Sequence, residues 1–179
     1  MKSALSLLFL GIGIPILSLA RVEVSERVAV VDPGVPRLGW KAFGAATLDS
    51  GEANGELWQV VNWSEAAKWG VGNRFTFKQP VRLHAYRAVE LEVLSSDEAG
   101  GSVSLGIESQ KGRTLRTPVA DSGALSTTWK KVEFPVSAFK DAPFEAADWE
   151  SVTQLKVFFI KPGATTKEKL SFRNVALIP

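Results

Sequence analysis

Cysteine is absent from this sequence of 179 residues, and histidine occurs once, as His84. The missing thiols exclude disulfides, thiolate zinc sites and cysteine nucleophiles. A single imidazole leaves a histidine-rich metal site without ligands, and we expect no cofactor and no metal site of these kinds. The sequence also lacks the Gly-x-Ser-x-Gly motif that would support a serine nucleophile beside His84. We therefore interpret His84 as a structural or surface residue.

Runs of a single charge are absent as well. The formal net charge is +2, and acidic and basic residues are mixed along the chain. Nucleic-acid-binding chains concentrate Lys and Arg into patches, and no such block occurs here. The sequence 70–72, Gly-Val-Gly, lacks the third glycine and the lysine-serine pair of phosphate-binding loops. We therefore expect no nucleic-acid or nucleotide partner.

One long apolar segment is present, at the N-terminus. Lys2 precedes an apolar run from Ala4 to Leu17, and small residues stand at Ser18 and Ala20. This order is typical of a cleavable signal peptide, and the run is shorter than the roughly 20 residues that span a bilayer. We predict a signal peptide over 1–20 and a single exported domain over 21–179, periplasmic or secreted, without a membrane span after cleavage. An uncleaved membrane anchor is the alternative.

The mature chain consists of short runs rich in β-branched and aromatic residues. Val89 and Leu91 alternate with Glu90 and Glu92, a period of two that predicts a strand with one buried and one wet face. Turn residues over 97–101 predict a hairpin between this strand and the next. The other expected strands are 22–31, 56–61, 75–77, 103–108, 113–119, 129–136, 155–160 and 169–177.

This spacing predicts an all-β fold, an antiparallel β-sandwich. The run 51–55 is interpreted as a break between strands, and only 64–69 and 146–152 have a short helical pattern. Strands do not alternate with long helices, which argues against a parallel α/β sheet.

Four segments resemble the galactose-binding-like jelly rolls, and among these the bacterial carbohydrate-binding modules attached to polysaccharide-degrading enzymes. The most specific is Trp129–Phe139, with its tryptophan, valine, hydrophobic-proline and phenylalanine order; the others are 86–93, 149–160 and 171–177. The resemblance covers about half of the mature chain and implies a jelly-roll sandwich. It also implies that Trp129 packs between the two sheets.

The closing segment departs from the family in one position. The family often has an aspartate before the asparagine of this strand, where this chain has Arg173 before Asn174. An arginine repels calcium and cannot ligate it. This argues against the structural calcium that the resemblance would otherwise imply.

Six tryptophans accompany a single tyrosine. Aromatic faces bind the flat C–H patches of sugars, and neighbouring polar groups fix the orientation of the ligand. Trp63 and Trp69 flank a segment outside any well-patterned strand, with Asn73 and Arg74 following shortly after. We predict that these four residues bind a poly- or oligosaccharide. The alternative is that both tryptophan rings pack on the edge of the sandwich.

The predicted function is non-catalytic carbohydrate binding without a cofactor. Two alternative functions of other classes remain open. One is a structural or protein-interaction sandwich of the bacterial envelope, whose partner is an envelope protein. The other is a small polysaccharide-degrading enzyme on the same fold, which needs two carboxylates in a groove. The 19 acidic residues do not single out such a pair.

Overall fold

A computed structural model describes residues 28–30, 40–44, 46–54, 56–63, 71–95, 102–117, 125–139, 144–160 and 169–179. The predicted signal peptide lies outside these residues, as does the predicted helix over 64–69. Within the described residues, no helix has the length and apolarity needed to cross a membrane.

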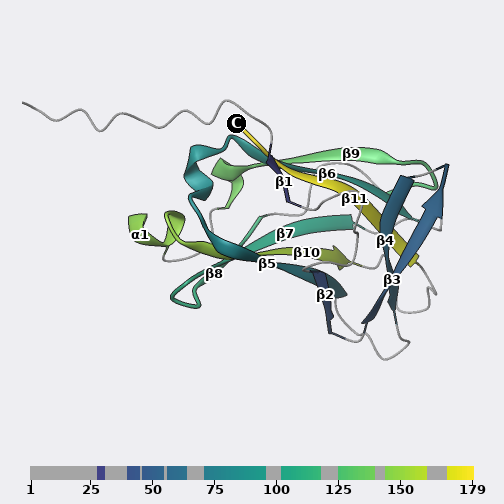
Figure 1. Ribbon diagram of the computed structural model, residues 1–179, viewed down its shortest axis with the longest axis horizontal. Helices are drawn as coiled ribbons and strands as arrows, with labels where there is room; N and C mark the ends of the chain where they lie inside the picture. Colours follow the sequence, from purple (N-terminus) through teal and green to yellow (C-terminus); the bar gives the residue numbers. More distant parts are fainter. Residues whose placement is uncertain are drawn as a thin grey trace, which may run out of the picture.

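Two antiparallel sheets face each other as layers of a sandwich (Figure 1). Sheet A has the order β3 (Ala46–Ala53), β4 (Glu56–Trp63), β11 (Lys169–Ile178), β6 (Ala88–Ser95) and β9 (Lys130–Pro135), and β1 (Val28–Ala29) also pairs with β11. Sheet B has the order β2 (Trp40–Phe43), β5 (Val71–Val81), β10 (Val152–Ile160), β7 (Ser102–Ser109) and β8 (Thr114–Arg116). The helix α1 (Ala146–Trp149) lies at one end of the sandwich, and two short 3-10 turns occupy Leu83–Ala85 and Val136–Ala138. The predicted all-β sandwich is confirmed.

The core lies between the sheets and follows the period-two patterns. Val89, Leu91 and Val93 of β6 are fully buried, as are Val103 and Leu105 of β7. Of the neighbours that alternate with them, Glu92 and Glu108 are partly covered, whereas Glu90 and Ser104 are buried. One buried face per strand is what an antiparallel sandwich requires.

Aromatic rings fill the centre of this core. Phe172 of β11 lies 5.0 Å from Trp40 and 5.9 Å from Phe159 of β10, between ring centroids. All three residues are buried, with exposed fractions of 4% or less. Because β10 and β11 are the middle strands of opposite sheets, this cluster joins the two layers at their centres.

The predicted hairpin between β6 and β7 is wrong. β6 pairs with β11 and β9 in sheet A, whereas β7 pairs with β10 and β8 in sheet B. A period of two reports which face of a strand is buried, but it does not report which strand lies beside it. Consecutive strands that cross from one sheet to the other therefore have the same pattern as a hairpin.

The predicted break over 51–55 is also wrong for most of its length. Strand β3 continues to Ala53, and the turn into β4 contains Asn54 at a φ of 53°. Gly51 lies inside this strand, and the ring of Trp58 on β4 covers it, which leaves no room for a larger side chain. An added Cβ there would come 2.2 Å from the Trp58 Nε1 atom.

Trp129 does not pack between the sheets, contrary to the expectation. Its ring is half-buried and lies 5.8 Å from Trp58, with the Arg173 guanidinium 4.2 Å from its centroid. Val132 and Phe134 point into the core, so Trp129 falls on the outer side of sheet A. Arg173 in turn donates from Nε to the Glu92 carboxylate at 2.7 Å.

Candidate functional site

The strand register of sheet B aligns four basic residues across its outer face. Arg74 pairs with Lys41 on one side and with Lys156 on the other. Lys156 pairs with Gly106, and Gly106 pairs with Arg116. Residues directly opposite one another in neighbouring strands carry their side chains on the same face. We call Lys41, Arg74, Lys156 and Arg116 the basic row.

The adjacent row across the same face is aromatic. Phe43 of β2 pairs with Gly72 of β5, and Gly72 pairs with Phe158 of β10. The two phenylalanine rings meet edge to face, with centroids 5.1 Å apart. Phe158 is only 8% exposed but belongs to the outer side, because its neighbours Val157 and Phe159 fill the core.

Two glycines provide the space in which these rings lie against the sheet. A Cβ on Gly72 would come 2.6 Å from the Phe43 ring and 2.0 Å from the Val157 carbonyl oxygen. A Cβ on Gly106 would come 2.6 Å from the Phe158 ring. A glycine inside a strand often marks such a close approach. The outer face of sheet B is therefore shaped to hold this aromatic pair.

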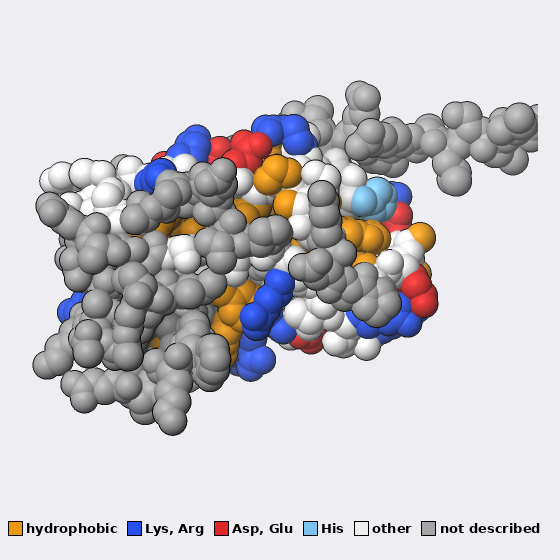
Figure 2. Space-filling view, turned by 180° about the vertical axis from the view of Figure 1, so that it is seen from behind, with side chains coloured by type: hydrophobic (Ala, Val, Ile, Leu, Met, Phe, Trp, Pro, Cys, Tyr) orange, Lys and Arg blue, Asp and Glu red, His pale blue; other side chains and the backbone are white. Residues whose placement is uncertain are grey.

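The two rows border a groove with a volume of about 680 Å³. Figure 2 shows hydrophobic side chains beside Lys and Arg side chains on the lower part of the molecule, where sheet B lies in Figure 1. We call this hollow the sheet B groove. The described residues that line it are Phe43, Arg74, Thr114, Arg116, Lys156 and Phe158.

Charge in the groove is unevenly compensated. Lys156 donates to the Glu108 carboxylate at 2.5 Å. The Arg116 guanidinium lies over the Phe158 ring, 3.9 Å from its centroid. Among the described residues, no carboxylate lies within ion-pair distance of Lys41, Arg74 or Arg116. The groove therefore combines aromatic surface with an excess of positive charge.

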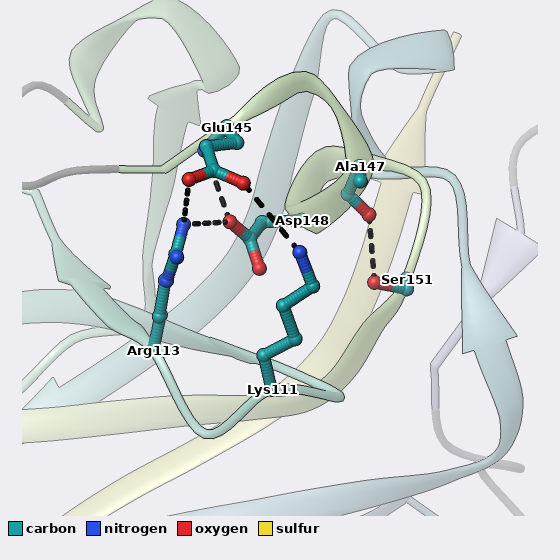
Figure 3. Close-up of polar contacts among 6 residues, drawn as sticks. All are labelled: Lys111, Arg113, Glu145, Ala147, Asp148 and Ser151. Atoms are coloured by element: carbon teal, nitrogen blue, oxygen red, sulfur yellow. Dashed lines mark hydrogen bonds and ion pairs between the residues drawn. The ribbon is translucent and has the colours of Figure 1, made fainter.

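A polar network anchors the hairpin that carries Arg116. Arg113, just before β8, donates to Asp148 at 2.9 Å and pairs with Glu145 at 3.0 Å, while Lys111 pairs with Glu145 at 3.5 Å (Figure 3). Asp148 is fully buried and accepts the backbone N–H of Glu145 at 3.0 Å, which caps helix α1. The network fixes the β7–β8 turn to the helix and so holds one edge of the groove.

This network predicts a loss of stability in acid. The backbone N–H of Glu145 is the main cause that lowers the pKa of Asp148, and the Arg113 hydrogen bond lowers the pKa of Glu145. Groups with a lowered folded-state pKa stabilise the protein above their unfolded pKa values, roughly 4, and lose that contribution as the pH falls through the folded values. We expect the urea midpoint to be flat from pH 7 to about 5 and to fall below roughly pH 4.

The variant Asp148→Asn tests whether this network causes the loss of stability in acid. It removes the titrating carboxylate at nearly constant volume, so it should lower the urea midpoint at pH 7 and flatten its decline in acid. The exposed Glu52→Gln on β3 is the control and should leave the acid decline unchanged. An acid profile that Asp148→Asn does not alter would contradict this role for the network.

A second hollow, of about 590 Å³, lies at the end of the sandwich beside α1. Tyr86 and Trp149 line it, and Trp149 also packs against the core with Phe144 at 5.1 Å. Its carboxylate, Glu150, accepts from Arg82 at 2.6 Å and lies 3.2 Å from His84 Nε2. Arg87, which also lines the hollow, pairs with Glu133, so the charged side chains described here already have ion-pair partners.

Of the four residues predicted to bind sugar, the structure describes the side chains of Asn73 and Arg74, and these point to opposite faces of β5. Arg74 is exposed and lines the sheet B groove. Asn73 is fully buried between the sheets, because successive residues of a strand point to opposite faces, so it is no surface ligand. Trp63 ends β4 in sheet A, and its side chain is not among those described. Trp69 lies outside the described residues.

Sequence reasoning missed most of the groove. Lys41, Phe43, Arg116, Lys156 and Phe158 come from three strands, β2, β8 and β10, that are distant in the sequence. Only the glycines gave an indication, since Gly72 and Gly106 each fall inside a strand, where glycine often marks the close approach of another group.

Comparison with solved structures shows the same fold in carbohydrate-binding modules. A family 11 module of the cellulosomal cellulase Lic26A-Cel5E of Clostridium thermocellum aligns with a TM-score of 0.61 and 12% identity, over 86% of this chain and 94% of that chain. A family 30 module of the cellulosomal cellulase Cel9D-Cel44B of the same organism aligns with a TM-score of 0.63 and 15% identity, over 84% and 96%. The family 11 module is also known in complex with a β-1,3-1,4-mixed-linked tetrasaccharide, and that structure aligns with a TM-score of 0.58 and 11% identity, over 85% and 95%.

These likenesses confirm the predicted jelly-roll fold. No protein-family description matches the sequence, and no curated protein matches it either.

Proposed function

We propose that this chain is an exported, non-catalytic carbohydrate-binding domain and that the sheet B groove is its binding surface. The observation that carries the proposal is the pair Phe43 and Phe158, held against the sheet by two glycines and bordered by basic side chains. Aromatic rings with adjacent hydrogen-bond donors are the surface that a sugar requires. The shared fold with carbohydrate-binding modules supports the proposal.

The composition of the groove supports binding rather than hydrolysis. Glycosidases use two carboxylates that flank the scissile bond. The described lining of the groove contains no carboxylate, and the neighbouring Glu108 is paired with Lys156. Within the described residues, no group of three or more His, Asp or Glu side chains is placed to hold a metal ion.

Export is the second part of the proposal. It rests on Lys2, the apolar run 4–17 and the small residues that precede Arg21. Expression of the full chain in a bacterial host should yield a product that begins at Arg21 in the periplasm or the medium. A product that keeps its first 20 residues and fractionates with the membrane would contradict this part.

The binding proposal is tested by a screen of the purified protein against polysaccharides. The panel holds neutral glucans, xylan and mannan together with acidic polymers, with retention measured by affinity electrophoresis and affinity by calorimetry. We expect selective binding of at least one polysaccharide. A folded, cooperatively melting protein that binds none of them would favour the alternative of an envelope interaction domain.

A further inference from the structure

We propose that the sheet B groove selects acidic polysaccharides, chains that carry carboxylate or sulfate groups, over neutral ones. The inference rests on the proposed function and names its substrate class. It is drawn from the basic row, in which Lys41, Arg74, Lys156 and Arg116 occupy four of the five strands at one level of the sheet.

The basic row is unfavourable for the folded protein on its own. Like charges placed directly opposite in neighbouring strands destabilise a sheet, and Arg74 has basic residues opposite it on both sides. In the described part of the chain, Glu108 compensates Lys156, while Lys41, Arg74 and Arg116 have no carboxylate partner. An anionic ligand would relieve this repulsion.

Arg116 is oriented to receive an anion. Its guanidinium lies on the face of Phe158, 3.9 Å from the ring centroid. Stacking uses the flat face of a guanidinium and leaves its in-plane N–H donors free for paired hydrogen bonds to a carboxylate or sulfate. The Phe158 ring therefore positions the arginine at the groove.

The length of the basic row matches a polymer better than a small anion. Neighbouring strands are roughly 4.8 Å apart, so the four intervals from β2 to β8 span about 19 Å. A chain lying across the strands would place its acidic groups along this row and a sugar face against the half-buried ring of Phe43.

Single-stranded nucleic acid is a different partner that also combines phosphates with stacking rings. The groove favours sugar because its aromatic surface consists of two rings set edge to face, with Phe158 mostly covered. Successive bases need open, parallel ring faces. A 20-nucleotide poly-dT strand is therefore included in the test as the competing outcome.

The experiment compares polymers that differ only in charge. Polygalacturonate, alginate and hyaluronan are each paired with their carboxyl-reduced form, chondroitin sulfate with its desulfated form, and cellulose oligomers and mixed-linked glucan are the neutral members. Dissociation constants of the full-length protein are measured at 50 and 300 mM NaCl. We expect at least one acidic polymer to bind roughly tenfold or more tightly than its neutralised form, with affinity falling as salt rises.

Variants test whether the basic row causes the preference for acidic polymers. Arg74→Gln/Arg116→Gln should weaken binding of the acidic polymer by roughly tenfold or more, because each arginine supplies charged hydrogen bonds. Arg116→Lys keeps the charge but loses the planar fork, so it should restore only part of the affinity. The control is Lys78→Gln. Lys78 is exposed and lies on β5 like Arg74 but outside the basic row, so this variant should bind like the parent protein.

Each outcome has one meaning. Equal or tighter binding of the neutral forms would overturn the acidic selectivity and leave the proposed function standing. Tighter binding of poly-dT than of every polysaccharide would overturn both. Binding of no polymer by the folded protein would also overturn both, and equal losses in the Lys78→Gln control would show that net charge, rather than the basic row, governs the affinity.

Discussion

Replacing both Phe43 and Phe158 by alanine is expected to weaken glycan binding by roughly 30-fold or more, while the protein remains folded. Truncating an anchor residue of a binding surface typically costs about 2 kcal/mol or more, and each 1.4 kcal/mol is about tenfold in affinity. The half-buried Phe43 ring offers the more open apolar surface of the pair. Phe158 supports both Phe43 and the Arg116 guanidinium, so its loss would also release the arginine.

The affinity of this double variant is measured by calorimetry with the polysaccharide that binds best in the screen, and its fold is checked by thermal melting. Trp129→Ala is the matched control, because Trp129 also meets another aromatic ring and also lies under an arginine, but on the outer side of sheet A. It should retain the affinity within about twofold. If only Trp129→Ala lost affinity, the binding site would lie on the outer side of sheet A and not in the sheet B groove.

Replacing Phe172 by alanine is expected to lower the free energy of unfolding by about 3–5 kcal/mol, the usual cost of deleting a large buried ring. Phe172 is 1% exposed and contacts Trp40 and Phe159, so its removal opens a cavity between the middle strands of both sheets. A loss of this size is a large fraction of the stability of an ordinary domain.

Urea denaturation measures this change, with the midpoint compared at constant slope. Phe43→Ala serves as the control, since it makes the same substitution on the outer side of the sandwich, where the ring is half-buried. We expect it to lose less than half as much stability. If Phe172→Ala lost no more than Phe43→Ala, the two sheets would not be joined by this aromatic cluster.

The strands could be predicted from the sequence because their cause is local. The alternation of Val89, Leu91 and Val93 with glutamates follows from one face that packs in the core. The structure confirms that these three side chains are buried, but Glu90 on the predicted wet face is buried as well. The choice of which strands pair with each other has no such local cause. Strand β6 lies beside β11 and β9, which are distant in the chain, and nothing in 88–95 encodes that choice.

The groove illustrates the same limit. Val157, Phe158 and Phe159 form an unbroken apolar run, so alternation cannot reveal that the middle residue faces outward. Asn73 and Arg74 are neighbours in sequence, which favours a shared site, yet the pleat of the strand directs the amide inward and the guanidinium outward. A binding surface that crosses five strands is defined by register, which appears only once the sheet is assembled.

Tryptophans were informative about packing but not about which face they occupy. Trp40 and Trp149 contact the core, and Trp58 and Trp129 form a pair on the outer side of sheet A. The aromatic pair in the groove consists of phenylalanines instead. The number of tryptophans therefore does not predict where aromatic rings face the groove.

The measurement that tests the central claim most directly is an NMR titration of the ¹⁵N-labelled protein with an oligosaccharide of the polysaccharide that binds best in the screen. The sheet B groove predicts that the largest amide shift changes fall on β2, β5, β8 and β10, around Phe43, Arg74, Arg116, Lys156 and Phe158. Changes centred instead on Trp58 and Trp129, or on the hollow beside Trp149, would contradict the account.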